Sequence, residues 1–358
     1  MNSFSIYDDI ATRTSGEIYM AVVGPVRTGK STFVRNFIEQ FLLPKVSDSL
    51  LDEIVDQLPL SGSGTTITTV EPKFIPKKAV EISVSPDDNT KQMKLKLIDC
   101  VGYMVDGANG HMVDGTVRMV KTPWQEEEIP FTKAADIGTR KVIYDHSTLA
   151  VVVTTDGSIS DIPRDSYVAP EQETICQLKE LGKPFVVVLN CLKPYSQETK
   201  SLAETMSDEY KIPVIPMNLE QLKEEDINKL FEQLIGMFPL SEIRYQVPEY
   251  VYMLDEDSNE REELLNKIKE LSSKLSYMRD VTPEISEMNG GIVSDVTLLN
   301  SNMENGKVTI RMELLEECYY EFISSLLGVK IQDDYEYYAM IKELADKSNE
   351  LQRLQGAW

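Results

Sequence analysis

Histidine is nearly absent from this chain of 358 residues, which contains only His111 and His146. Two imidazoles cannot build a histidine-rich metal site, so metalloenzymes of that class are excluded. Cysteine is also scarce, and its positions show no metal-ligand spacing. We therefore expect reduced core thiols in a cytoplasmic protein. The four cysteines are Cys100, Cys176, Cys191 and Cys318.

Basic residues are few, and long apolar runs are missing. Lysine and arginine total 36 against 59 acidic residues, which gives a formal charge of −23. Such a surface repels nucleic acid and anionic lipid, so neither is expected as a direct partner. No apolar run reaches membrane-spanning length, and residues 1–10 lack the basic segment and apolar core of a secretory signal. The length predicts about two domains of a soluble globular protein.

What the sequence does contain is the pattern G-x-x-x-x-G-K-[ST] at residues 24–31. This pattern is the phosphate-binding P-loop. Residues 18–23 predict a buried parallel strand before it, and residues 31–40 predict a helix after it. That arrangement directs backbone N–H groups and the positive helix end toward a polyphosphate. Lys30 would reach the outer phosphates, and the Ser31 hydroxyl would hold magnesium.

A second signal follows an apolar strand predicted over residues 93–98. Asp99 occupies the Walker B position, where an acid holds magnesium, usually through water. Gly102 completes D-x-x-G, and its N–H group could meet the γ-phosphate. Many GTPases place next a glutamine that orients the attacking water. Here that residue is Tyr103, so another group must position the water.

A threonine-rich segment, residues 65–69, lies between the P-loop and the next strand. A threonine hydroxyl there can close on magnesium when the γ-phosphate is present, as in a switch loop. Threonine also favours strands, so an ordinary strand threonine is the alternative. Beside a P-loop we prefer the switch, with Thr69 ahead of Thr68.

Apolar strands alternate with helical patterns throughout residues 1–240. This alternation predicts an α/β P-loop NTPase domain whose mostly parallel sheet is covered by helices on both faces. Residues 44–131 are expected to carry the switch and an elaborated lobe, in which the run 126–128 forms a solvated acidic face. The predicted strands are 80–84, 93–98, 149–155, 185–190 and 214–217, and the helices 132–144, 170–181 and 224–238.

Residues 239–248 are expected to form the boundary between two domains, and residues 241–358 predict a smaller α+β domain. Its helical patterns cover 258–280, 314–327 and 334–354, with strands expected within 281–311. It contains no nucleophile–base pair, so an interaction or scaffolding role is preferred.

The predicted strand at residues 185–190 bears on base specificity. GTPases read guanine with N-K-x-D, in which the aspartate accepts hydrogen bonds from the base. Asn190 is present here, but Cys191 replaces the lysine and Lys193 replaces the aspartate. A lysine cannot accept those hydrogen bonds. ATP is therefore the better prediction than GTP.

With these motifs, the chain resembles the stage IV sporulation protein A family, the spore-coat morphogenetic ATPases of endospore-forming bacteria. The resemblance spans essentially the whole chain. Its most specific parts are GPVRTGKSTFVRNF, TTITTVEPKFIP, LIDCVGY, TPWQEEEIPFTKAADIGTRKVI and VVVTTDGSISDI. The block around Trp124 is the strongest mark, because generic P-loop proteins have nothing similar.

The resemblance implies a relative of translation-factor-type GTPases that uses ATP and Mg²⁺. It implies a mother-cell protein that forms a homopolymer with other coat proteins at the outer forespore surface, with hydrolysis linked to polymerisation. The membrane would be reached only through other proteins or through a C-terminal region, tied to assembly, that family members carry beyond the point where this chain ends. On that basis we expect a truncated chain that turns over ATP slowly alone and forms stable polymers only with that region.

The motifs and the resemblance together give the expected site residues. Lys30, Thr69 and Asp99 would be catalytic, and Ser31 would share the metal with Thr69 and Asp99. The second sensor position departs from the family, because Thr69 is followed by Val70. The nucleotide-binding set would be Gly24, Pro25, Val26, Arg27, Thr28, Gly29, Lys30, Ser31, Thr32, Gly102 and Asn190.

Two other functions stay open at this point. One is a regulatory GTPase-type switch, against which the altered N-K-x-D argues. The other is a scaffold that binds nucleotide without hydrolysis, which Tyr103 in place of glutamine permits. The candidates for stabilising the transition state are Arg27, Arg140 and Arg164, in no order.

Overall fold

The computed structural model of the chain describes residues 17–46, 48–59, 71–85, 88–108, 110, 112–113, 116–302 and 306–355. The backbone divides into two units, Met1–Phe238 and Pro239–Trp358. Each unit has its own sheet and its own core.

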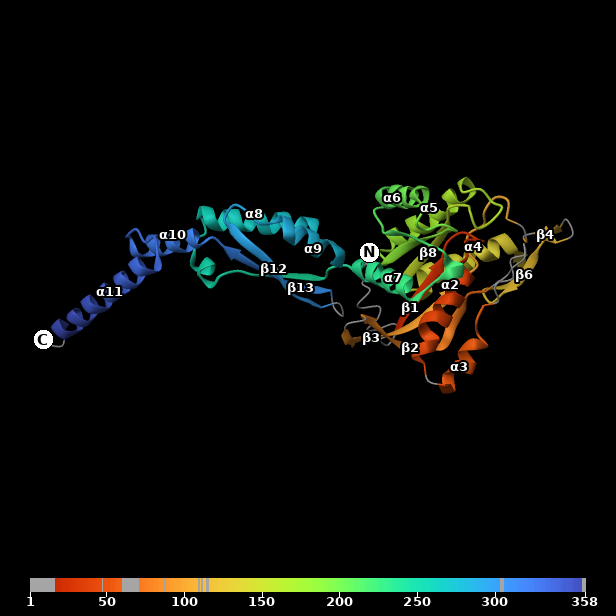
Figure 1. Cartoon of the computed structure of the whole chain (residues 1–358), viewed down its shortest axis with the longest axis horizontal. Helices are drawn as coiled ribbons and strands as arrows, with labels where there is room; N and C mark the ends of the chain where they lie inside the picture. Colours follow the sequence, from red (N-terminus) through yellow and green to blue (C-terminus); the bar gives the residue numbers. More distant parts are fainter. Residues whose placement is uncertain are drawn as a thin grey trace. The chain divides into compact units, whose positions relative to one another are not determined.

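A six-stranded sheet of order β10-β9-β8-β1-β3-β2 forms the centre of the first unit (Figure 1). All neighbouring strands are parallel except β2, which is antiparallel to β3. β8 and β9 are buried along their whole length, as expected for strands with helices on both faces. The mostly parallel α/β fold is thus confirmed. The strands are β1 (Glu17–Val23), β2 (Lys73–Ser85), β3 (Asp88–Asp99), β8 (Leu149–Thr155), β9 (Phe185–Asn190) and β10 (Val214–Met217).

Helices flank this sheet (Figure 1). The P-loop helix continues through a π-helical turn, and its residues Phe37 and Phe41 pack against Phe231 of α7. This aromatic cluster anchors the helix that carries Lys30. The helices are α2 (Lys30–Phe37) with its turn (Ile38–Leu42), α3 (Asp48–Val55), α4 (Phe131–Lys141) with a π-turn (Val142–His146), α5 (Asp165–Glu180), α6 (Gln197–Tyr210) and α7 (Glu224–Gly236).

The elaborated lobe consists of two small hairpins, β4 (Met112–Val113) with β5 (Thr116–Val117) and β6 (Met119–Thr122) with β7 (Gln125–Pro130). The acidic run lies in β7, where Glu127 and Glu128 are exposed. At the tip of the second hairpin Trp124 lies close to α4: a Cβ at Gly138 would be 3.6 Å from its ring and 3.9 Å from Pro72. The lobe is therefore packed on the helix that follows it.

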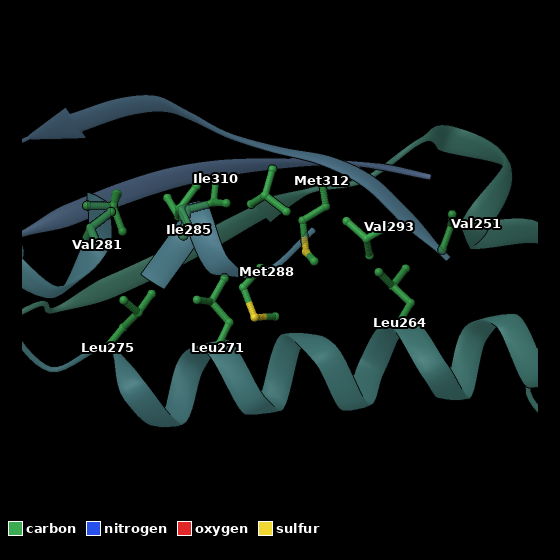
Figure 2. Packing of buried hydrophobic residues seen from close by; sticks show 12 residues of the cluster. Val251, Leu264, Leu271, Leu275, Val281, Ile285, Met288, Val293, Ile310 and Met312 are labelled. Carbon is green, nitrogen blue, oxygen red and sulfur yellow. The ribbon is translucent and has the colours of Figure 1, made fainter. Parts of the chain in front are cut away.

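The second unit has a three-stranded sheet of order β11-β13-β12. In Figure 2, Leu264 and Leu271 of α8 point toward Ile310 and Met312 of the sheet. This buried layer is the core of the unit. The elements are β11 (Glu242–Gln246), β12 (Val293–Asn302), β13 (Lys307–Leu314), α8 (Asn259–Lys274), α9 (Met278–Glu287), α10 (Glu316–Leu327) and α11 (Asp334–Gln355).

Several boundaries differ from the sequence prediction. The single helix expected over 258–280 is two helices, because Asp280 accepts hydrogen bonds from the N–H groups of Ser276 and Tyr277 and starts α9 there. Residues 281–287 are helical rather than extended, and Val281 and Ile285 face the core at helical spacing.

The first unit differs at α5, which begins before Pro170 and contains it, whereas the sequence prediction started the helix at that proline. The segment read as a boundary contains β11. No helix in the described parts of the chain combines the length and apolarity that a bilayer crossing requires.

Candidate nucleotide-binding site

The P-loop connects the end of β1 to the start of α2, and its backbone requires two glycines. Gly24 has φ 125° and Gly29 has φ 95°, values that side chains rarely adopt. A Cβ at Gly24 would overlap the carbonyl oxygen of Val153, and one at Gly29 would lie 2.5 Å from Asn190 Nδ2. The loop is therefore held tightly between the strand ends of the sheet.

Inside this loop Lys30 is almost completely buried, with 5% of the residue's surface exposed. Its Nζ donates to the carbonyl oxygen of Pro25, to which the Thr28 hydroxyl also donates at 3.0 Å. Burial lowers the pKa of Lys30, although Cys100 and Asp99 nearby oppose this shift. A bound phosphate would place negative charge beside this buried ammonium and so favour its charged form.

Asp99 ends β3 and is fully buried beside the P-loop. The Ser31 hydroxyl donates to Asp99 Oδ2 at 2.9 Å, whereas Oδ1 is buried without a hydrogen-bond partner among the described residues. Burial raises the pKa of this carboxyl, because the ionised form is poorly solvated. An orphaned oxygen next to a hydroxyl fits a hard divalent cation.

The described residues contain no group of three or more His, Cys, Asp and Glu side chains that could hold a metal alone. A cation here would therefore take one carboxylate and one hydroxyl from the protein and its other ligands from phosphate and water. That donor set is typical of magnesium bound together with a nucleotide.

The D-x-x-G segment lies directly against Lys30. Gly102 has φ 96°, and a Cβ there would overlap the Gly24 carbonyl oxygen and lie 2.5 Å from Lys30 Nζ. The Gly102 N–H donates to the Thr139 hydroxyl at 3.1 Å. Thr139 lies 37 positions further along the chain on α4, within the family-specific block around Trp124, but no pattern in that block predicted this contact.

Tyr103 is buried, with 3% of its surface exposed, and its hydroxyl donates to Gln177 of α5 at 2.6 Å. Its carbonyl oxygen accepts the N–H of Val26, a second link between the P-loop and this segment. The Tyr103 side chain is thus held by α5 and by Arg140 of α4 and does not replace the missing glutamine.

Asn190 lies at the end of β9 and bridges two loops. Its Nδ2 donates to the Thr28 carbonyl at 3.0 Å, and its Oδ1 accepts the N–H of Leu219 at 3.2 Å. Cys191 beside it is buried and Lys193 is exposed. Asn190 thereby fixes the P-loop against the loop after β10.

Comparisons with known protein families match the whole chain. The family model described as "Stage IV sporulation protein A, ATPase domain" matches residues 1–239, and the one for the middle domain of the same protein matches residues 240–358. The chain belongs to the stage IV sporulation protein A family. The P-loop, Asp99 and Gly102 all lie within the matched ATPase domain, so the chain is an ATPase that binds nucleotide.

Curated members of the family align over nearly the whole chain. Stage IV sporulation protein A of Clostridioides difficile (strain 630) is 42% identical over 357 residues, which cover 99% of this chain and 72% of that protein. The Bacillus anthracis protein is 40% identical over 93% of this chain and 67% of its own length. The Bacillus subtilis (strain 168) protein is 37% identical over 100% of this chain and 72% of its own length.

The sensor threonines Thr68 and Thr69 lie outside the described residues. Of the three arginines considered for this family member, Arg164 makes a bidentate ion pair with the fully buried Glu171. Arg140 is exposed and lies 3.5 Å from Glu173. Arg27 lies within the P-loop itself, with φ 62°.

Proposed function

We propose that the chain is a slow ATPase whose turnover is coupled to self-assembly in the basal layer of the spore coat. The observation that carries the proposal is the meeting of Lys30, Ser31 and Asp99 in one buried site within an ATPase domain. Nucleotide chemistry would reside in residues 1–240, and residues 241–358 would supply an assembly surface.

The backbone of residues 24–32 would surround the phosphates, with the Lys30 ammonium close to the outer ones. Ser31 and Asp99 would hold Mg²⁺, together with Thr69. Mg²⁺, when bound, neutralises charge on the outer phosphates. Gly102 adjoins Lys30 and would offer its N–H to the γ-phosphate.

Thr69→Ala should retain ATP binding and hydrolyse ATP at least about tenfold more slowly, since a sensor threonine acts on closure and not on first capture. Thr68→Ala is the control, for which a smaller effect is expected. Equilibrium binding and single-turnover assays separate the two steps. Loss of ATP binding in Thr69→Ala would instead indicate that Thr69 is a structural threonine of a strand.

GTP in excess should compete poorly with labelled ATP. Lys193 is exposed in the loop between β9 and α6, where a guanine reader would need an acceptor. Losing a hydrogen bond to a charged group costs about 1.5–3 kcal/mol, or roughly 10- to 150-fold in affinity. Equal competition by GTP would favour the regulatory switch.

The proposed partners are further copies of the chain and other coat proteins at the outer forespore surface of the mother cell. Apolar side chains on α11 support self-association: Tyr338 is 64% exposed, Ile341 and Leu344 are each 43% exposed, and Leu351 is 59% exposed. Their spacing places them on one side of the helix.

Sedimentation with ATP and magnesium tests this role for the chain and for a version extended by the region found in longer relatives. We expect Ile341→Glu to reduce pelleting of the longer version, whereas Ala339→Glu, on the other side of α11, should not. Equal pelleting by both lengths would place the whole assembly surface within residues 1–358. ATP turnover without pelleting in either length would refute the scaffold role.

A further inference from the structure

The hydrogen bond between Gly102 and Thr139 occupies the N–H group that D-x-x-G offers to a γ-phosphate. Both residues are buried, and the donor–acceptor distance is 3.1 Å. Gly102 also lies against Lys30, so its amide is already at the phosphate end of the site. The Thr139 hydroxyl therefore accepts the same N–H group that the γ-phosphate of a bound nucleotide would accept.

Thr139 belongs to the buried face of α4, whose other members are apolar or glycine. Its hydroxyl is also close enough to Cys100 to lower the pKa of that thiol, against the larger effect of burial. Threonine at a fully buried helix position costs free energy unless its hydroxyl is hydrogen-bonded. At this position the Gly102 N–H provides that bond.

The segment around Gly102 is anchored on both sides. The Cys100 thiol donates to the Val22 carbonyl at 3.2 Å, and the Tyr103 carbonyl accepts from Val26 at 2.8 Å. Two residues, Val101 and Gly102, lie between these anchors, and the glycine can change its backbone angles with little steric cost. The amide of Gly102 can thus turn between two acceptors while its neighbours stay in place.

We infer that Thr139 is a positioning residue, which holds the Gly102 N–H in the nucleotide-free and ADP-bound states and releases it to the γ-phosphate of ATP. The inference rests on the proposed ATPase site. Because one N–H serves two acceptors in turn, the Thr139 hydroxyl competes with the γ-phosphate. It thereby sets how strongly the site distinguishes ATP from ADP.

Removing the hydroxyl should raise the ratio of ATP affinity to ADP affinity. Thr139→Val keeps the shape of the side chain. In the nucleotide-free and ADP-bound states this variant leaves the Gly102 N–H without an acceptor, whereas in the ATP-bound state the γ-phosphate accepts from it. One hydrogen bond of this kind corresponds to about a fivefold to tenfold increase in the ratio. Thr139→Ser keeps the hydroxyl and should stay within about twofold of the wild type.

The experiment measures the Kd of ADP and of a non-hydrolysable ATP analogue, with magnesium, for the whole chain. Thr174→Val is the matched control: Thr174 is also a fully buried helical threonine, and its hydroxyl donates to Pro170 on α5. It should leave the ratio unchanged even if it lowers the melting temperature. If Thr139 had only a structural role, Thr139→Val would change the melting temperature and leave the affinity ratio unchanged.

An unchanged ratio in folded Thr139→Val would overturn the inference. If that variant does not fold, the Gly102 amide resonance of the wild type, labelled selectively on glycine, provides the second test. It should shift between the ADP complex and the complex with the ATP analogue, and identical positions would overturn the inference as well. Failure of the wild type to bind ATP would instead refute the proposed function.

Discussion

Lys30→Ala should lower the rate of ATP hydrolysis by about 10²- to 10³-fold and weaken ATP binding. The Lys30 ammonium is buried at the meeting point of the P-loop, Asp99 and Gly102. A charge fixed there in advance stabilises the negative charge that develops on the outer phosphates, and its effect is large because water is excluded. Alanine removes the charge without replacing it.

Lys183→Ala is the matched control for this prediction. Lys183 is likewise a buried lysine of the first unit, 4% exposed, but its Nζ donates to the carbonyl oxygens of Ile143 and Ser147 at the end of the π-turn after α4. Its loss should reduce thermal stability and leave the turnover per folded molecule nearly unchanged. Turnover measured by phosphate release, at saturating ATP and magnesium, decides the comparison. Near-normal activity in Lys30→Ala would contradict the P-loop assignment.

The parts of the site that could be predicted from sequence are those marked by a local motif or by the end of a buried strand. The P-loop pattern alone predicts its local geometry, because Gly24, Gly29 and Lys30 lie within one short segment of the chain. Asp99 could be placed because a buried strand ends at it, and parallel strands deliver their carboxyl ends to the same edge of a sheet. The fold of the first unit could be predicted because strand and helix patterns alternate along its sequence.

The contacts that sequence reasoning missed are long-range. Thr139 reaches Gly102 only because α4 packs against the segment after β3, and although Thr139 lies in the family-specific block around Trp124, no local pattern in that block predicts the contact. The second role of Asn190, as a bridge from Thr28 to Leu219, depends on β9 and β10 lying side by side. The pairing of β11 with β13 is likewise non-local, and the prolines on either side of β11 suggested a linker.

Asp99→Asn should abolish magnesium-dependent turnover and, in the absence of nucleotide, raise the melting temperature. The burial of Asp99 raises the pKa of its carboxyl even though Ser31 and Lys30 act in the opposite direction. The fold therefore disfavours the ionised carboxylate relative to water, and this destabilises the nucleotide-free protein at neutral pH. Asparagine has nearly the same shape and no charge, and its side-chain oxygen can still accept the Ser31 hydroxyl.

We expect a gain of about 1 kcal/mol, which corresponds to roughly 2–4 °C for a unit of this size. Thermal melting of the wild type and the variant, each with EDTA, with ATP and EDTA, and with ATP and magnesium, tests both parts. In the wild type, magnesium should add stability beyond that from ATP alone, because a ligand that binds only the folded state stabilises it. In Asp99→Asn that increment should vanish, since a neutral amide is a poor ligand for a hard cation. A lower melting temperature without nucleotide, together with an intact magnesium increment, would mean that the buried carboxylate is a structural group and that the metal binds elsewhere.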